Sequence, residues 1–193
     1  MDKKYRKIWE LAEPYLKEGV IKDFVLHTEG VVRATEMILK KEKGDEDILI
    51  PAAILHDVGW AKVPPKLQNV KDRKENNKKI IRKALELHIE FAPEIINKIL
   101  TELKYDRKII KRIIDVVYDH KFKNPRDINK RILIDADTVG CIFREQFYSD
   151  MKSYENTARE SYEHRKSDDT FYTKTAKEIF EREMKKRKRE VSN

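Results

Sequence analysis

The sequence predicts an all-α protein. Apolar residues recur three and four positions apart along most of the chain, which is the spacing of one helix face. Hardly any segment alternates between polar and apolar residues as a strand would. A length of 193 residues suits one domain with a real core. These observations predict one domain in which helices dominate.

The periodic segments predict eight helices. We expect them at residues 4–17, 22–41, 47–58, 78–104, 106–120, 128–147, 153–166 and 171–189. The third is apolar almost all round and should be the buried central helix, with Pro51 tolerated because it lies in the first turn. Residues 59–77, which include Pro64 and Pro65, interrupt the periodicity and indicate a loop. A bend is expected at Pro93, and the last two helices are polar and should be peripheral.

The composition is typical of a soluble protein. Hydrophobic residues make up 39% of the chain and charged residues 40%. No segment approaches the roughly 18 consecutive apolar residues of a membrane span, and residues 1–5 lack the apolar run of a signal peptide. A single cysteine, Cys141, cannot form an internal disulfide. We therefore expect a cytoplasmic protein with one domain over residues 1–193, a core at about 20–147, and peripheral helices with a basic tail at 148–193.

The net charge of +8 is concentrated in two segments. Residues 171–193 hold eight basic and four acidic side chains, and residues 61–79 hold seven basic and two acidic ones. A solvated surface and an anion-binding role are both open interpretations of these segments. Nucleic acid and membrane are not the partners we expect, and the oligomeric state stays open, a homodimer included.

Four of the five histidines lie on apolar helix faces. Each has apolar or small residues three and four positions away along its helix. These four are His27, His56, His88 and His120. Asp57 shares this character, whereas His164 stands between Glu163 and Arg165 and should be on the surface. The sequence therefore directs four imidazoles and one carboxylate inward.

A single inward histidine is most often a core residue hydrogen-bonded to a carbonyl group. Four of them together with Asp57 are costly to bury, because a buried carboxylate must be paired or must bind a metal. Asp137 has apolar or small neighbours at its helical offsets and is a further candidate ligand. Asp135, with Arg131 four residues before it, is instead expected to be an ion-pair partner or to orient a ligating histidine.

This set of donors predicts a transition-metal site. Imidazoles mixed with carboxylates and without thiolates suit one or two divalent ions of Mn, Fe, Co, Ni or Zn. Six candidate ligands exceed the need of one four-coordinate ion, so two ions bridged by Asp57 are expected. His27, His56 and Asp137 would hold one ion, and His88 and His120 the other. Such a pair generates a hydroxide and clamps phosphoryl oxygens, which predicts phosphoester or phosphoanhydride hydrolysis with Asp57 and His56 as catalytic residues.

The ordered motifs carry a family resemblance over about residues 23–147. They are His27-Thr28-Glu29-Gly30-Val31-Val32, Ala52-Ala53-Ile54-Leu55-His56-Asp57-Val58-Gly59, His88-Ile89-Glu90-Phe91-Ala92, Ile113-Ile114-Asp115-Val116-Val117-Tyr118-Asp119-His120 and Asp135-Ala136-Asp137. This pattern resembles the HD-domain superfamily of metal-dependent phosphohydrolases. The resemblance implies a compact helical bundle. It matches His27, His56, Asp57 and Asp137 to the core metal ligands, and His88 and His120 to the extra histidines of two-metal members.

Three departures from the family's patterns narrow the expected substrate. Residues 58–62 replace the Glu-Asp motif of enzymes that degrade the stringent-response nucleotide. A Gly-Tyr-Pro signature of cyclic-dinucleotide phosphodiesterases is lacking, and Thr138 takes the place of a basic residue often found after the last aspartate. The resemblance still implies a nucleotide or another small phosphorylated metabolite as substrate.

Residues 59–77 follow the metal ligands directly and are expected to capture this substrate. Trp60, Lys62 and Lys66 offer an aromatic surface and positive charge to an anion. Two alternatives to a phosphohydrolase stay open. One is a di-iron HD-type oxygenase, and the other is a non-catalytic metal- or nucleotide-binding module with a basic partner-binding tail. The basic run at residues 185–189 is expected to fray into solvent and to be dispensable for hydrolysis.

Overall fold

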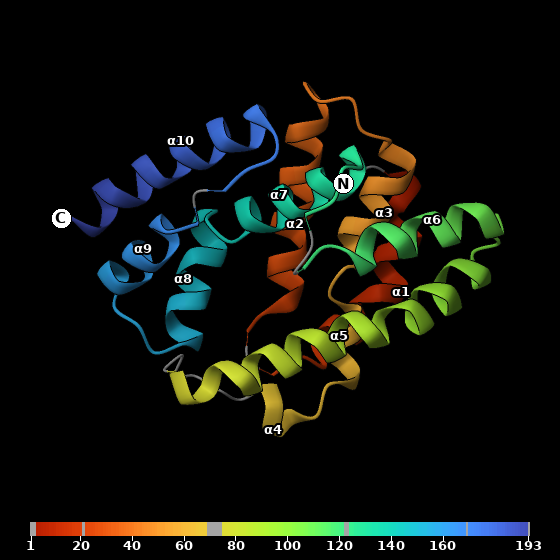
Figure 1. Ribbon diagram of the computed structural model, residues 1–193, viewed down its shortest axis with the longest axis horizontal. Helices are drawn as coiled ribbons and strands as arrows, with labels where there is room; N and C mark the ends of the chain where they lie inside the picture. Colours follow the sequence, from red (N-terminus) through yellow and green to blue (C-terminus); the bar gives the residue numbers. More distant parts are fainter. Residues whose placement is uncertain (1–2, 21, 69–74, 122–123, 169, 193) are drawn as a thin grey trace.

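The computed structural model describes residues 3–20, 22–68, 75–121, 124–168 and 170–192 (Figure 1). Over these ranges the chain forms α-helices and short 3-10 helices and no strand, which confirms the all-α prediction. In chain order they are η1 (Lys3–Tyr5), α1 (Arg6–Lys17), α2 (Phe24–Leu39), α3 (Glu46–Leu55), η2 (Val58–Lys62), α4 (Pro65–Gln68), α5 (Glu75–Glu102), α6 (Arg107–Tyr118), α7 (Ile128–Gly140), α8 (Arg144–Ser153), α9 (Ala158–Lys166) and α10 (Lys174–Val191).

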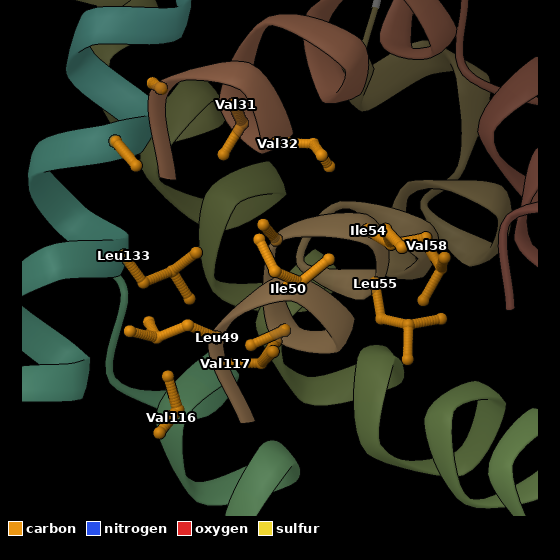
Figure 2. Close-up of a cluster of buried hydrophobic side chains, with 14 of the residues drawn as sticks. Val31, Val32, Leu49, Ile50, Ile54, Leu55, Val58, Val116, Val117 and Leu133 are labelled. Atoms are coloured by element: carbon orange, nitrogen blue, oxygen red, sulfur yellow. The ribbon is translucent and has the colours of Figure 1, made fainter. Parts of the chain in front are cut away.

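Helix α3 is the centre of the core, as its all-round apolar sequence predicts. Asp45 caps its first turn by accepting a hydrogen bond from the backbone N–H of Asp47. Every residue from Ile48 to Leu55 is buried, and burying one such large apolar side chain contributes about 1.5–3 kcal/mol. The helix is packed by α1, α2, α6 and α7, and Figure 2 shows its side chains meeting those of α2, α6 and α7. Four helices therefore pack around α3, which ends just before His56 and Asp57.

The segment expected as a loop at residues 59–77 is partly helical. It holds most of η2, all of α4 and the start of α5. Gln68 explains the order of the first part, because its buried amide donates to the carbonyl oxygens of Trp60 and Val63 at 3.0 and 2.7 Å. Its side-chain oxygen accepts from the backbone N–H of Val20 at 3.1 Å. A local apolar pattern could not reveal these bonds, so the loop prediction was wrong for the helical part of the segment, while residues 69–74 lie outside the described residues.

The single helix expected at residues 128–147 is two helices. Helix α7 ends at Gly140, and Phe143 takes an extended conformation with φ −60° and ψ 146° before α8 begins. Phe143, in this turn, is 3% exposed. Burial of its aromatic ring offsets the helical hydrogen bonds that the chain gives up at the break. The apolar residues keep a helical spacing across this break, so the sequence pattern did not reveal it.

Helices α8, α9 and α10 lie together on one side of the bundle (Figure 1). Helix α10 packs against α7 and α9 and buries Ile179, Phe180 and Met184. Arg187, within the basic run expected to fray, is 2% exposed and pairs with Glu190 at 3.1 Å. The expectation of a frayed tail was therefore wrong, because one face of the helix is buried.

Asp135 connects α7 to the start of α10. Its carboxylate accepts hydrogen bonds from the backbone N–H groups of Tyr172 and Thr173 at 3.0 and 2.8 Å, and from the Thr173 hydroxyl at 2.7 Å. Burial raises the pKa of Asp135 above its usual value, and these hydrogen bonds act in the opposite direction. We expected an ion-pair partner or a group that orients a histidine. In the structure, Asp135 instead accepts hydrogen bonds from Tyr172 and Thr173, in the segment before α10.

Truncation after Glu183 is expected to lower the free energy of unfolding by about 2–4 kcal/mol, because it removes the buried side chains of Met184 and Arg187. Urea denaturation of the truncated and full-length chains measures this difference. A chain cut after Glu190 serves as the control, because it keeps both residues. Equal stability of all three chains would contradict the packing of α10 described above.

Within the described ranges, no helix combines the length and apolar character needed to cross a membrane.

Candidate metal centre

The structure brings the six candidate ligands together at the end of the central helix. They come from α2 (His27), the C-cap of α3 and the residue after it (His56 and Asp57), α5 (His88), the turn after α6 (His120) and α7 (Asp137). All six are 6% exposed or less. His27, His56 and Asp57 form one group of potential donors, and Asp57, His88 and His120 form a second, while Asp137 is grouped with His27 and Cys141.

The first donor group consists of His27, His56, Asp57 and Asp137. The Nε2 atom of His27 lies 3.1 Å from Oδ1 of Asp137 and 3.4 Å from Oδ2 of Asp57. The Nε2 atom of His56 lies 3.3 Å from the same Asp57 oxygen and 4.0 Å from Oδ1 of Asp137. Two imidazole nitrogens and two carboxylate oxygens therefore converge on one point.

A close contact between two helices positions this group. Gly30 of α2 faces Gly140 of α7, where an added Cβ on Gly140 would lie 2.8 Å from Cγ2 and 2.9 Å from the backbone nitrogen of Val31. Glycine allows this approach because it has no Cβ. His27 and Asp137 each precede one of these glycines by three residues, so both lie about one turn from the contact. The contact thus brings the two side chains within reach of each other.

The second donor group consists of Asp57, His88 and His120. The Nε2 atom of His88 lies 3.6 Å from Oδ1 of Asp57 and 3.3 Å from Nε2 of His120. Another glycine sets this distance, because a Cβ on Gly59 would lie 1.9 Å from the backbone oxygen of His88. Helix α5 can therefore pack directly on η2, two residues after Asp57.

Trp60 supports the second donor group. Its indole ring stacks on His88 with centroids 4.7 Å apart and an interplanar angle of 11°. Its N–H group donates to Oδ1 of Asp57 at 3.1 Å. We predicted Trp60 as a substrate-binding residue, and the structure places it against two of the candidate ligands and on the wall of the adjoining cavity.

Hydrogen bonds to backbone carbonyl groups identify the ring nitrogen of His56 and of His120 that can bind a metal ion. The Nδ1 atom of His56 lies 2.7 Å from the carbonyl oxygen of Ala53, and that of His120 lies 2.5 Å from the carbonyl oxygen of Val117. A carbonyl oxygen only accepts, so both Nδ1 atoms carry the proton and both neutral Nε2 atoms present a lone pair. This is the usual way in which a protein orients a ligating imidazole.

These lone pairs face other electron-rich atoms, which tests whether the site suits a cation. The Nε2 atoms of His56 and His27 are 3.4 Å apart, and His56 also faces Asp57. His88 has a buried Nδ1 atom without a hydrogen-bond partner among the described residues. Converging lone pairs and carboxylates repel one another unless a proton, as on His27, or a metal ion lies between them. The donor set therefore fits divalent metal ions.

The charges of the centre keep both carboxylates ionised. Burial alone would raise the pKa of Asp57, but its interactions with His56, Lys22 and His27 hold it well below the usual value. Burial likewise opposes ionisation of Asp137, whose pKa is held low by the ammonium group of Lys121 and by His27. Lys121 forms an ion pair with Oδ2 of Asp137, the oxygen other than the one facing His27. Asp137 therefore bridges the centre and a lysine.

The histidines differ in protonation. Burial lowers the pKa of His88 to about 4 and that of His120 well below its usual value, so both are neutral at pH 7, the form that binds metals. Burial and the charge of Lys22 would lower the pKa of His27, but Cys141 and Asp137 outweigh them and raise it to about 9. A metal ion that binds His27 must displace this proton.

A cavity of about 210 Å³ adjoins the metal centre. We call it the basic pocket, because it is lined by three cationic side chains and, among the described residues, by no carboxylate. Its lining comprises Lys22, Phe24, Trp60, Leu67, Gln68, Ile81, Ala84, Leu85, Lys121, Cys141, Tyr154 and Arg165. The pocket is the natural place for an anionic ligand next to the candidate ligands.

Lys62 and Lys66, predicted as substrate-binding residues, are not part of this lining. The ammonium group of Lys62 pairs with Glu94 of α5 at 2.6 Å, and Lys66 is exposed on α4. Their role in binding substrate therefore stays a prediction. The cations that line the pocket precede α2, follow α6 and lie on α9, and residue spacing along the chain gives no signal that brings them together.

Cys141 is a further neighbour that the sequence prediction left aside. Its Sγ atom lies 3.7 Å from Nδ1 of His27, and it forms a third potential donor group with His27 and Asp137. Burial alone would raise the pKa of this thiol, but Arg165 and His27 lower it. The signal was its position four residues after Asp137, on the same face of the chain.

Comparison with known protein families matches the HD domain over residues 24–140. Searches of curated proteins and of solved structures gave no match. The matched stretch contains all six candidate ligands, the two glycine contacts and the central helix, and it covers more than half of the chain. The chain therefore belongs to the HD-domain family, within the superfamily of metal-dependent phosphohydrolases.

Proposed function

We propose that this protein hydrolyses a phosphoester or phosphoanhydride bond of a nucleotide or a related small phosphorylated metabolite. We further propose that His27, His56, Asp57 and Asp137 hold one divalent ion and that Asp57, His88 and His120 hold a second. The observation that carries the proposal is the pair of donor groups sharing Asp57 beside a cavity lined with cations. A phosphate needs both features, because its oxygens carry the charge that metals and ammonium groups offset.

Divalent ions in these groups would lower the pKa of a bound water and draw negative charge from phosphoryl oxygens. The side chains of this chain supply the remaining requirements. Asp57 is shared between the donor groups, and Trp60 holds it by a hydrogen bond. His56 is held by the carbonyl oxygen of Ala53. Both residues, which we propose as catalytic, thus stay fixed while a substrate reacts.

Lys121 connects the metal centre to the basic pocket. It pairs with Asp137 and also lines the cavity, with 29% of its side chain exposed. The negative charge of Asp137 raises the pKa of Lys121 against the effect of burial, so the ammonium group stays charged. We propose that it contacts the phosphate that is cleaved.

A substrate screen tests the proposal. Protein loaded in turn with Mn, Co, Ni, Zn or Fe is incubated with nucleoside mono-, di- and triphosphates and with a chromogenic phosphodiester, and the products are separated by chromatography. We expect release of phosphate or pyrophosphate that depends on the metal. Intact substrates throughout would contradict hydrolysis, and oxygen consumption by the iron-loaded protein would favour the oxygenase alternative.

A further inference from the structure

The three cations of the basic pocket have different charged neighbours. Lys121 forms an ion pair with Asp137, a candidate ligand. Lys22 is acted on by Cys141, by Asp57 of the centre and by Asp150 of α8. Cys141 and Asp150 also act on Arg165, whose guanidinium group pairs with Asp150 and Asp168 at 2.7 and 3.5 Å. The two cations therefore have Cys141 and Asp150 as common neighbours.

Lys22 has no carboxylate partner of its own within the described part of the chain. Its ammonium group lies 5.1 Å from the centre of the Phe24 ring, a cation–π contact on the pocket wall. No carboxylate among the described lining residues competes for its charge. A cation that is half buried in this way loses hydration, and an anionic ligand would offset that loss.

Arg165 is fixed and keeps donors for a ligand. Its side chain is 16% exposed and forms an ion pair with Asp150, which is 5% exposed. A guanidinium group carries five N–H donors, of which the two ion pairs engage only some. Tyr154, on the turn after α8, lines the pocket beside it. This wall belongs to residues outside the matched HD domain.

We infer that Lys22 and Arg165 form a subsite for a second anionic group of the substrate, a carboxylate or a further phosphate that is not cleaved. The inference rests on the proposed function, because it assumes that the first anionic group lies at the metal centre and Lys121. It assigns substrate selection to Lys22, which precedes α2, and to Arg165 of α9, which packs on α8. It narrows the substrate class to small molecules with two anionic groups.

Binding of three stable phosphonates tests this subsite. Methylphosphonate carries one anionic group, 3-phosphonopropionate adds a carboxylate, and propane-1,3-diphosphonate adds a second phosphonate. Calorimetry on Mn-loaded wild type is expected to give about tenfold tighter binding for at least one of the two larger probes, since one charge-assisted hydrogen bond contributes that much. A gain with the carboxylate alone, or with the diphosphonate alone, identifies the kind of second group.

Lys22→Gln and Arg165→Gln are expected to lose this gain and to bind methylphosphonate within twofold of wild type. Lys111→Gln and Arg159→Gln, which remove the same charges from exposed positions on α6 and α9, are expected to keep it. Circular dichroism checks folding, because Arg165→Gln leaves Asp150 without its cation. If that variant unfolds, Lys22→Gln decides the test and Arg165→Lys is expected to retain part of the gain.

Metal content separates failure of the inference from failure of the proposed function. A wild-type protein that binds Mn and methylphosphonate but binds all three probes equally contradicts the second subsite alone. Retention of the full gain in Lys22→Gln also contradicts it. A wild-type protein that takes up no Mn, Co, Ni, Zn or Fe contradicts the proposed function itself.

Discussion

Replacing Asp57 by Asn is expected to remove most of the bound metal and to lower kcat about a thousandfold or more. Asp57 is the only residue shared by the two donor groups, with one oxygen 3.3 Å from His56 and the other 3.6 Å from His88. The amide of Asn cannot supply the negative charge that offsets two cations. Elemental analysis of purified, metal-replete protein, together with single-turnover kinetics, measures both effects.

Variants of the histidines in the second donor group test the two-ion assignment against a one-ion alternative. His88→Ala and His120→Ala are expected to keep one ion of two, because the first donor group is intact, and to give a folded but slow enzyme. His164→Ala, a change at an exposed position, is the control and should bind as much metal as wild type. Metal content in His88→Ala and His120→Ala equal to that of wild type would contradict the two-ion assignment and would leave these histidines as contacts to phosphate.

Removing the metal ions is expected to lower the midpoint of thermal unfolding by roughly 10 °C. An ion present at a thousand times its Kd stabilises the folded state by about 4 kcal/mol, and 1 kcal/mol corresponds to about 2–4 °C for a chain of this size. The buried lone pairs and carboxylates of the donor groups then lose their common partner. Thermal unfolding of Mn-loaded and chelator-treated protein, monitored by circular dichroism, gives the difference.

Asp57→Asn provides the control for this measurement as well. Its unfolding midpoint should be insensitive to the chelator, because it has little metal to lose. Restoring Mn to treated wild type should restore the midpoint. Identical midpoints for loaded and treated wild type would show that the donor groups are stable without a cation, and would remove the physical basis of the metal centre.

The sequence could predict several of the candidate ligands because they lie on apolar helix faces. His27 and His88 lie among apolar residues at helical spacing, and helix burial follows from that local pattern. The all-round apolar α3 likewise marks itself as the central helix. Once the apolar faces of the helices are known, few ways of packing them can bury four imidazoles and two carboxylates. A packing that brings these side chains to one shared centre satisfies all of them at a single site.

The basic pocket could not be predicted in this way. Lys22, Lys121 and Arg165 lie on polar segments whose apolar pattern resembles that of any solvent-facing stretch, and only tertiary packing turns them toward one cavity. Trp60 shows the same limit, since its stacking on His88 depends on the approach of η2 to α5. The break after Gly140 was hidden because a helical period continues across it.

The two glycine contacts have a consequence for how such a centre can change. One donor group depends on the approach of α2 and α7 at Gly30 and Gly140, and the other on the approach of η2 and α5 at Gly59. Different pairs of elements thus set the spacing of the two groups, which share only Asp57. Under the two-ion proposal, a substitution at Gly30 or Gly140 is expected to disturb the group that contains His27 and Asp137 more than the group that contains His88 and His120. The proposed centre can thus lose one ion through a change in helix packing while every ligand is retained.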